Sequence, residues 1–290
     1  SVMAEEDIDF NRNFPTHWAP ETEQPGAGHL PLSEPETSAV ARFITNHTHI
    51  FAALNLHTFG GVTIRPPMNG DDSQLAPQDL AVYKQLEEWS EAILGYPMVT
   101  GFQGFSPREG LPVYGSFMDF CASQGIITYV AELWDLFAQI GVSPKNRFVD
   151  TYASLSREEL LALGQWDQRH NKSRALRPWT TVDHPQIGCV EVGGMDPRVG
   201  IWNPTPEKIQ DICIQQASML FRLAAMAPRV TVEAIQIQRV DEATTCVEIK
   251  ITNLGYLPTY GAHQAREIHQ DNSLLFTVET QGCSLIALDN

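Results

Sequence analysis

Two short apolar stretches decide the fold: residues 51–57, FAALNLH, and residues 126–132, IITYVAE. Each is of strand length, too short for a typical helix, and each ends in a side chain capable of acid–base chemistry or metal binding. Helical patterns occur before, between and after them, over residues 33–46, 77–95 and 206–226. Alternating buried strands and amphipathic helices are typical of an α/β domain.

Local signals support the three predicted helices. Ser33 and Glu36 form the S-x-x-E pattern that caps a helix start. The 77–95 segment carries an apolar stripe with helical spacing. The same holds for residues 206–226, where we expect five side chains to face inward. The stripe residues are Val82, Leu86, Trp89 and Ile93, and, in the last helix, Ile209, Ile212, Cys213, Leu220 and Leu223.

The pattern changes after Pro228. Residues 230–237 and 247–252 alternate with period two, 274–278 and 284–288 are shorter strand candidates, and no helical signal remains. We therefore predict two domains: an α/β domain over residues 1–228 and a small β-rich accessory module, similar to a β-sandwich, over 229–290. Within the first domain, residues 188–192 predict another strand, and residues 140–187 carry no regular pattern.

Composition excludes several classes of protein. The chain has 290 residues, of which 43% are hydrophobic and 19% charged, so wholesale disorder is excluded. The formal net charge of −16 argues against binding nucleic acid or an anionic membrane through bulk charge. No apolar run approaches the roughly eighteen residues that a transmembrane helix needs. Five cysteines without a C-x-x-C motif indicate neither a disulfide framework nor a thiolate zinc site. They leave the compartment open, with a secreted or periplasmic location favoured.

Three features carry candidate chemistry. His57 ends a buried strand and is followed by small residues, where a metal ligand or acid–base group belongs; the alternative is a structural His bonded to backbone. Asn11 and Arg12 offer an amide and a guanidinium fork for a carboxylate. The alternative is that the triplet Asn11-Arg12-Asn13 is a surface turn. Glu132 follows an apolar strand, where burial would raise its pKa and suit a general base; the alternative is a partnered strand-end Glu.

Together these features resemble the zinc carboxypeptidases, the carboxypeptidase A-like metallopeptidases. Residues 9–14, DFNRNF, are similar to the family's D-x-N-R-N-aromatic segment, and residues 33–36, SEPE, to the start of the helix before the third zinc ligand. Residues 53–59, ALNLHTF, resemble the strand that ends in this ligand. The stretches 118–120, 125–126 and 131–135 resemble the approach to the catalytic glutamate. The resemblance spans residues 9–135 and implies a mixed sheet flanked by helices.

The resemblance implies a role for each matching residue. His57 would be one of three zinc ligands, and Asn11 and Arg12 would hold the terminal carboxylate of a peptide. Glu132 would accept a proton from the zinc-bound water. Tyr114 lies near the tyrosine that caps the substrate, and Met118 lies at the pocket floor, where an apolar residue predicts a preference for apolar or aromatic terminal side chains. The implied function is hydrolysis of C-terminal peptide bonds, with zinc as cofactor and a peptide or protein C-terminus as substrate.

Two departures from the family pattern leave alternatives open. The family's H-x-x-E pair of zinc ligands is absent, since no His here has Glu or Asp three positions later. We expect the chain to lack the amino-terminal part of the catalytic domain and to bind zinc weakly, or else to have lost zinc. The rival functions are a non-catalytic binder of peptides or carbohydrates and a zinc amidohydrolase acting on a non-peptide amide. Glu191 lies on a predicted strand nearer the last helix and is an alternative to Glu132 as the base.

Overall fold

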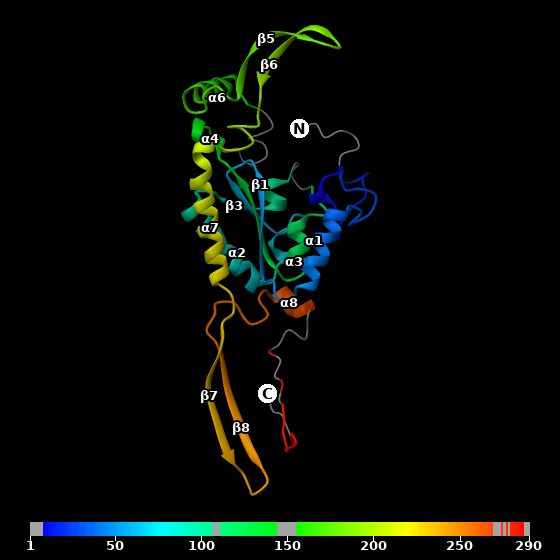
Figure 1. The fold of residues 1–290 in the computed structure, drawn as a ribbon, viewed down its shortest axis with the longest axis vertical. Coiled ribbons are helices and arrows are strands. Elements are labelled where there is room, and N and C mark those ends of the chain that lie inside the picture. Colours follow the sequence, from blue (N-terminus) through cyan, green and yellow to red (C-terminus); the bar gives the residue numbers. More distant parts are fainter. Residues whose placement is uncertain are drawn as a thin grey trace.

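The computed structural model describes residues 8–106, 111–143, 155–268, 274, 277 and 279–286. A four-stranded sheet lies at the centre of the molecule (Figure 1). Its order is β1-β4-β2-β3; β1 pairs with β4 and β2 with β3 in parallel, whereas β2 and β4 are antiparallel. The strands are β1 (Ala52–Thr58), β2 (Val62–Arg65), β3 (Met98–Thr100) and β4 (Ile127–Leu133). The predicted mixed sheet is therefore confirmed.

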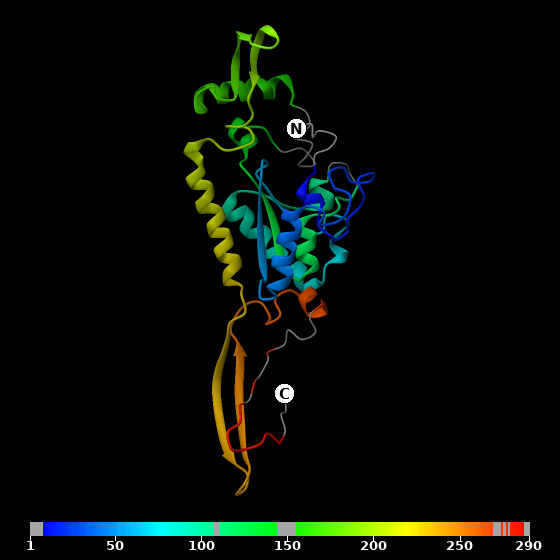
Figure 2. The same cartoon turned by 45° about the vertical axis from the view of Figure 1, so that its right-hand side comes forward.

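Helices cover both faces of this sheet (Figure 2). On one face, α2 (Pro77–Trp89), the π-helical turn η3 (Ser90–Leu94) and α7 (Ile209–Ala225) pack against alternate residues of β4. On the other face lie α1 (Pro35–Asn46) and α3 (Phe117–Ser123). Side chains of a strand alternate between its two faces, so Ile127, Tyr129 and Ala131 enter the first core, and Val130 enters a cluster on the opposite face.

Further helices complete the described structure. They are η1 (Phe10–Arg12), η2 (Asp72–Gln74), η4 (Gly101–Phe105), α4 (Leu136–Ile140), α6 (Arg157–His170), η5 (Pro206–Lys208) and α8 (His263–Ile268). A buried ion-pair cluster joins β2 to α2 and η2. There, the Arg65 guanidinium donates to Asp72 at 2.7 and 2.9 Å and to Glu87 at 2.8 Å. No helix in the described part of the chain is long and apolar enough to cross a membrane.

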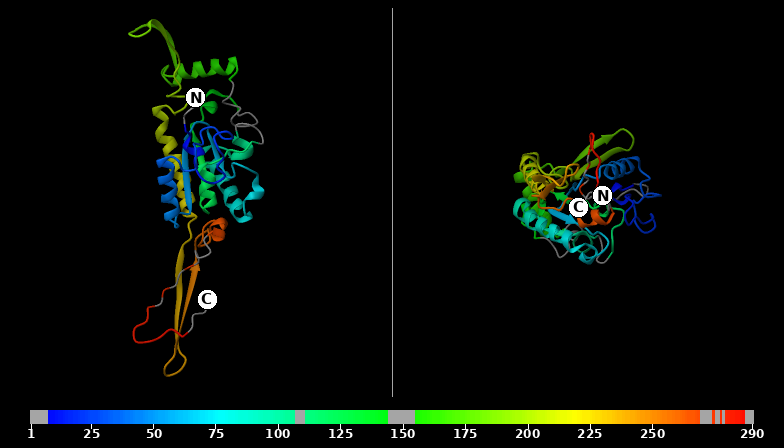
Figure 3. Two further views of the ribbon diagram at one scale, coloured as in Figure 1. Left: turned by 90° about the vertical axis from the view of Figure 1, so that its right-hand side faces the viewer. Right: turned by 90° about the horizontal axis from the view of Figure 1, so that it is seen from below.

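Two antiparallel hairpins extend from opposite ends of this domain (Figures 1 and 3). One pairs β5 (Leu176–His184) with β6 (Gly188–Met195) beyond α6, and the other pairs β7 (Val230–Arg239) with β8 (Thr245–Asn253). The predicted C-terminal β module is thus present as a strand pair. Its apolar side chains, such as Ile235 and Ile237, stay largely exposed in the described structure.

Residues 140–228 differ from the sequence prediction in three ways. The 140–187 segment is not irregular, because it contains α6 and β5 among its described residues. The strand at 188–192 is β6, and it pairs with β5 instead of extending the main sheet. In α7 the buried positions include Ile212, Met219 and Leu223, whereas Ile209, Cys213 and Leu220 are exposed. The inward face is therefore rotated from the predicted stripe.

Smaller differences occur at the helix ends and near the carboxyl terminus. Ser33 does not cap α1, because its hydroxyl donates to the neighbouring Glu34 side chain. α8 is a helix where none was expected, and Leu257 and Ala262 join the core of the α/β domain. Segment 255–268 thus packs on the first predicted domain. No strand forms at 284–286; within the other candidate, 274–278, only residues 274 and 277 are described.

Candidate active site

The carboxyl ends of β1 and β4 place His57 beside Glu132. The two residues are register partners in the parallel pair, so their side chains leave the sheet on the same face. His57 Nδ1 lies 4.0 Å from Glu132 Oε1. The Gly61 N–H donates to the Glu132 carbonyl at 2.8 Å, and this bond closes the turn after β1 over the end of β4. The sheet register therefore sets the separation of these two side chains.

A loop that is hydrogen-bonded to the start of α3 places Asn11 and Arg12 in the same cavity lining as His57 and Glu132. The Asn11 side-chain oxygen accepts a hydrogen bond from the Phe117 backbone N–H at 2.8 Å. This bond satisfies one of the N–H groups at the start of α3 that have no partner within the helix. The Arg12 guanidinium donates to its neighbour's backbone carbonyl and lies 3.7 Å from the Asp9 carboxylate. Gly115 approaches the Arg12 backbone so closely that a Cβ there would lie 2.1 Å from the Arg12 carbonyl oxygen.

These residues line one cavity of about 220 Å³. Its lining contains six polar side chains and six apolar ones. The polar lining is Asp9, Asn11, Arg12, His57, Ser116 and Glu132; the apolar lining is Ile64, Met68, Phe105, Val113, Met118 and Val130. Met118 is 1% exposed and lies among the apolar residues, as a pocket floor would. An apolar cavity with a few convergent polar groups is the usual form of a small-ligand site.

Burial shifts the pKa values of His57 and Glu132 in the directions that favour their neutral forms. Burial lowers the pKa of His57, partly opposed by the Asp9 carboxylate, while the Arg12 guanidinium adds to the lowering. Burial raises the pKa of Glu132 to about 7, and Arg12 partly opposes this. The His57–Glu132 contact is therefore not a fully charged ion pair at neutral pH. A neutral imidazole suits metal binding, and a carboxyl group that titrates near pH 7 suits proton transfer.

The described residues do not complete a zinc site. A catalytic zinc takes three protein ligands and keeps an open position for water. No group of three or more His, Cys, Asp or Glu side chains in the described structure is arranged to hold a metal. His57 supplies one ligand of suitable chemistry, and two others would have to come from outside the described residues.

The other histidines near an acidic or a second histidine side chain in the sequence lie in different surroundings. Glu21, four residues after His17, accepts hydrogen bonds from two backbone N–H groups of its own loop. The His47 ring stacks on Phe43 at 4.2 Å and lies 5.7 Å from the His49 ring. His263 and Glu267 lie on α8, which packs against Gly125 before the start of β4, at the end of the sheet opposite His57.

The remaining predicted residues lie outside the cavity. Tyr114 does not line it, and its backbone N–H donates to the Gln24 side chain at 3.2 Å. Glu191 is exposed on β6, where it pairs with Thr181 in the hairpin that projects beyond α6. The structure therefore does not bring Glu191 to the cavity of His57, because its strand belongs to a separate sheet.

Asn13 organises the Arg12 loop, a role that the sequence did not indicate. Asn13 is completely buried and donates to the carbonyls of Ala27 and Leu30 and to the Ser33 hydroxyl. Its own carbonyl oxygen accepts from the Thr37 hydroxyl at 2.6 Å. The sequence shows that Asn13 directly follows Arg12, but the residues that hydrogen-bond to its side chain lie 14 to 24 positions away. No local pattern identifies such partners.

Comparison with known proteins assigns the family. The profile of the zinc carboxypeptidase family matches residues 3–153, just over half of the chain, and the chain belongs to this family. A profile described as a domain of unknown function matches residues 229–289. No curated protein matches the chain.

Two solved structures illustrate the likeness. One is a crystal structure of thrombin-activatable fibrinolysis inhibitor, 24% identical, covering 46% of this chain and 36% of that chain with a TM-score of 0.37. The other is the bovine inhibitor in complex with tick carboxypeptidase inhibitor, 23% identical, covering 46% of this chain and 49% of that one, with a TM-score of 0.36. The matched region thus spans less than half of either relative's length.

Proposed function

We propose that this protein is a metallocarboxypeptidase that hydrolyses the C-terminal peptide bond of peptides ending in an apolar or aromatic residue. The observation that supports this most is the convergence of Arg12, His57 and Glu132 on one cavity with Met118 at its base. Three segments far apart in the sequence supply these groups. A purely structural role for each would require no such convergence.

Each side chain has a distinct proposed role. Arg12 forms paired hydrogen bonds with the terminal carboxylate, because the planar guanidinium matches two carboxylate oxygens. Asn11 contributes its amide N–H₂, since its carbonyl oxygen is already engaged by Phe117. Glu132 accepts a proton from the attacking water and delivers it to the leaving amine. His57 would contribute one ligand to the zinc of this family, whose other ligands the described residues do not provide.

The cavity floor supports the proposed preference. Met118, Val113 and Val130 are each at most 5% exposed and belong to an apolar part of the lining that also contains Ile64 and Met68. A charged terminal side chain would therefore lose its hydration without gaining a partner. An aromatic or aliphatic side chain would bury apolar surface instead.

Recognition of the terminal carboxylate can be tested without catalysis. Calorimetry should show that N-acetylphenylalanine binds at least about tenfold more tightly than its amide, the loss expected for one charge-assisted pair. Arg12→Ala should abolish this difference, whereas Arg42→Ala, an exposed arginine on α1, should preserve it. Equal binding of acid and amide by the unmodified protein would refute the proposed role of Arg12.

Catalysis is tested separately, with zinc supplied and hippuryl-phenylalanine as substrate, in a longer chain that brings the two further zinc ligands. Glu132→Gln should lower turnover by about 10² to 10⁴, because it removes the proton-transfer group. Glu191→Gln, a matched change on the exposed hairpin, should leave turnover unaltered. Carboxylate-dependent binding without any hydrolysis would instead favour the non-catalytic peptide binder.

A further inference from the structure

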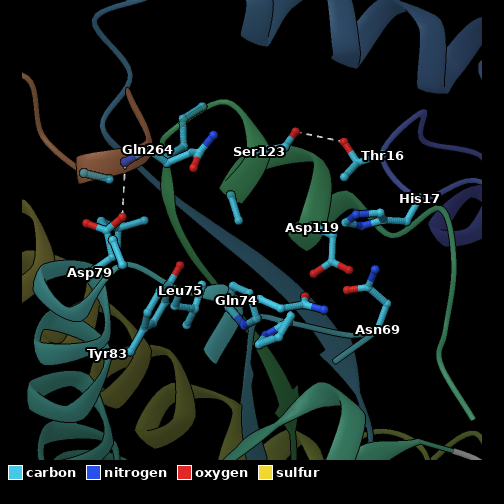
Figure 4. A pocket seen from close by; sticks show the side chains of 17 residues that line it. Thr16, His17, Asn69, Gln74, Leu75, Asp79, Tyr83, Asp119, Ser123 and Gln264 are labelled. Atoms are coloured by element: carbon cyan, nitrogen blue, oxygen red, sulfur yellow. Dashed lines mark hydrogen bonds between the residues drawn. The ribbon is translucent and has the colours of Figure 1, made fainter. Parts of the chain in front are cut away.

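A second cavity, of about 280 Å³, lies at the opposite end of the sheet from the candidate active site. It sits beside the start of β4, among α2, α3, α8 and the loop after β2 (Figure 4). None of its lining residues also lines the candidate active site. The carboxypeptidase site therefore leaves this space without a role.

One part of the wall is apolar and another is rich in hydrogen-bond acceptors. The apolar part comprises Pro66, Pro67, Leu75, Ile126, Ile127 and Ala262. Asp119, on α3, is 5% exposed, and its two carboxylate oxygens share a single donor, the Met68 N–H, at 3.1 and 3.3 Å. The nearby Asn69 side-chain oxygen is buried and accepts no hydrogen bond in the described structure. Figure 4 shows the Asn69 amide and the Asp119 carboxyl group close together on one side of the space.

Side chains of the lining that could donate, such as Gln74 and Gln264, form no hydrogen bond with these acceptors in the described structure. A carboxylate can accept about four hydrogen bonds and an amide oxygen two, so Asp119 and Asn69 are both undersupplied. The lining contains Asp79 as a second acid and no lysine or arginine. Asp79 already accepts from the first two N–H groups of α8, and the Thr16 and Ser123 hydroxyls bond each other. His17 is exposed, and Figure 4 shows its ring beside the Asp119 carboxyl group.

We propose that this cavity binds a small organic cation, an alkylguanidinium, whose N–H groups donate to Asp119 and Asn69 and whose alkyl part packs on the proline and isoleucine wall. A guanidinium matches the observations because its planar fork carries five donors and pairs with carboxylates in two parallel hydrogen bonds. Groups of three side chains suited to a metal ion are absent from the described structure, so a bare metal ion is a poorer occupant.

A ligand bound in this second cavity should change the positions of residues in the candidate active site. The Met68 N–H that donates to Asp119 belongs to a residue whose side chain lines the first cavity. Met118, at the floor of that cavity, directly precedes Asp119 on α3. A ligand that draws the Asp119 carboxylate toward itself would therefore shift both methionines. The cation site does not depend on the carboxypeptidase proposal, because the two cavities share no lining residue.

The test is a titration of the full chain with butylguanidinium, followed by methyl NMR at pH 8 and 0.15 M salt. The salt weakens diffuse attraction to a chain with a formal net charge of −16. Saturable shifts are expected for the methyl groups of Ile126, Ile127 and Ala262, with a smaller shift at Met68. The Val182 methyl groups, on the β5–β6 hairpin beyond α6, should not move. N-butylurea, a neutral analogue of similar shape, should bind at least about tenfold more weakly.

Two variants decide whether the binding is local. Asp119→Asn removes the charge, and Ala122→Leu fills the cavity from its wall on α3 while it keeps every polar group. Each should weaken butylguanidinium at least about tenfold. If the first variant does not fold, the second still discriminates. The proposal is overturned if no saturable shift occurs up to about 10 mM, if both folded variants bind as the unmodified chain does, or if N-butylurea binds equally well.

Discussion

Substitution of Gly115 by alanine tests whether the loop before α3 holds Arg12 in place. Gly115 has a φ of +68°, and an added Cβ would lie 2.1 Å from the Arg12 carbonyl oxygen and 2.7 Å from its carbonyl carbon. Relief of this overlap requires roughly 1 Å of backbone movement. The left-handed conformation costs about 1 kcal/mol, and displacement of packed backbone adds about 1–3 kcal/mol. We therefore expect Gly115→Ala to lower the free energy of unfolding by about 3 kcal/mol.

The matched control is Gly188→Ala at the start of β6. Gly188 has a φ of +74°, but no atom lies within 4 Å of its added Cβ, so this variant has only the conformational strain of about 1 kcal/mol. Urea denaturation measures both values, and calorimetry with N-acetylphenylalanine should show weaker binding for Gly115→Ala alone. Equal destabilisation of the two variants, with unchanged ligand binding, would refute the argument that the close approach positions Arg12.

Three further predictions concern buried polar groups. Asn13→Ala should lower the free energy of unfolding in urea by about 3 kcal/mol, because three acceptors and the Thr37 hydroxyl lose their partner; a loss below about 1 kcal/mol would contradict this. Burial raises the pKa of Asp119 from 3.8 to about 7, so the folded state binds this proton more tightly than the unfolded state. As pH rises from about 4 to 7, the free energy of unfolding of the unmodified protein should therefore fall by up to about 4 kcal/mol relative to that of Asp119→Asn. If the free energies of unfolding of the two proteins change with pH in parallel, this linkage is excluded. Arg65→Met should cost about 3 kcal/mol in thermal or urea unfolding, the lower end for a broken buried pair because Asp72 stays 37% exposed; an unchanged midpoint would show that the cluster adds nothing.

The sequence predicts β1, β4 and the strand-end chemistry because they depend on local patterns, whereas β2 and β3, of four and three residues, were not predicted. An apolar run that ends in a polar residue specifies a buried strand and the edge of the sheet where its last side chain emerges. His57 and Glu132 therefore lie side by side, as the two runs indicate. Arg12 was a candidate on its side-chain chemistry, but its place beside His57, like that of Met118, was expected only through family resemblance, because both depend on how the Arg12 loop packs against α3.

The incorrect predictions have a common physical cause. Period-two alternation marks β6 as a strand but does not identify its partner, so the sequence could not distinguish an extension of the main sheet from a separate hairpin. In α7, apolar residues occur all round the helix, and the buried face depends on the angle at which it crosses the sheet. Leu220 and Cys213 are exposed for this reason, although they fit an apolar stripe. α8 was missed because six residues are too few to show a helical period.

The candidate site depends on two supports that should fail independently. Sheet register holds His57 and Glu132 together, and any slip in the β1–β4 pair would move both side chains to other partners. The Arg12 loop is held instead by the Asn13 hydrogen bonds and by the close approach of Gly115, neither of which touches β1. Damage to the loop should therefore weaken carboxylate recognition and leave the His57–Glu132 contact intact. This separation predicts that a change in the Arg12 loop alters carboxylate affinity while Glu132 keeps its environment.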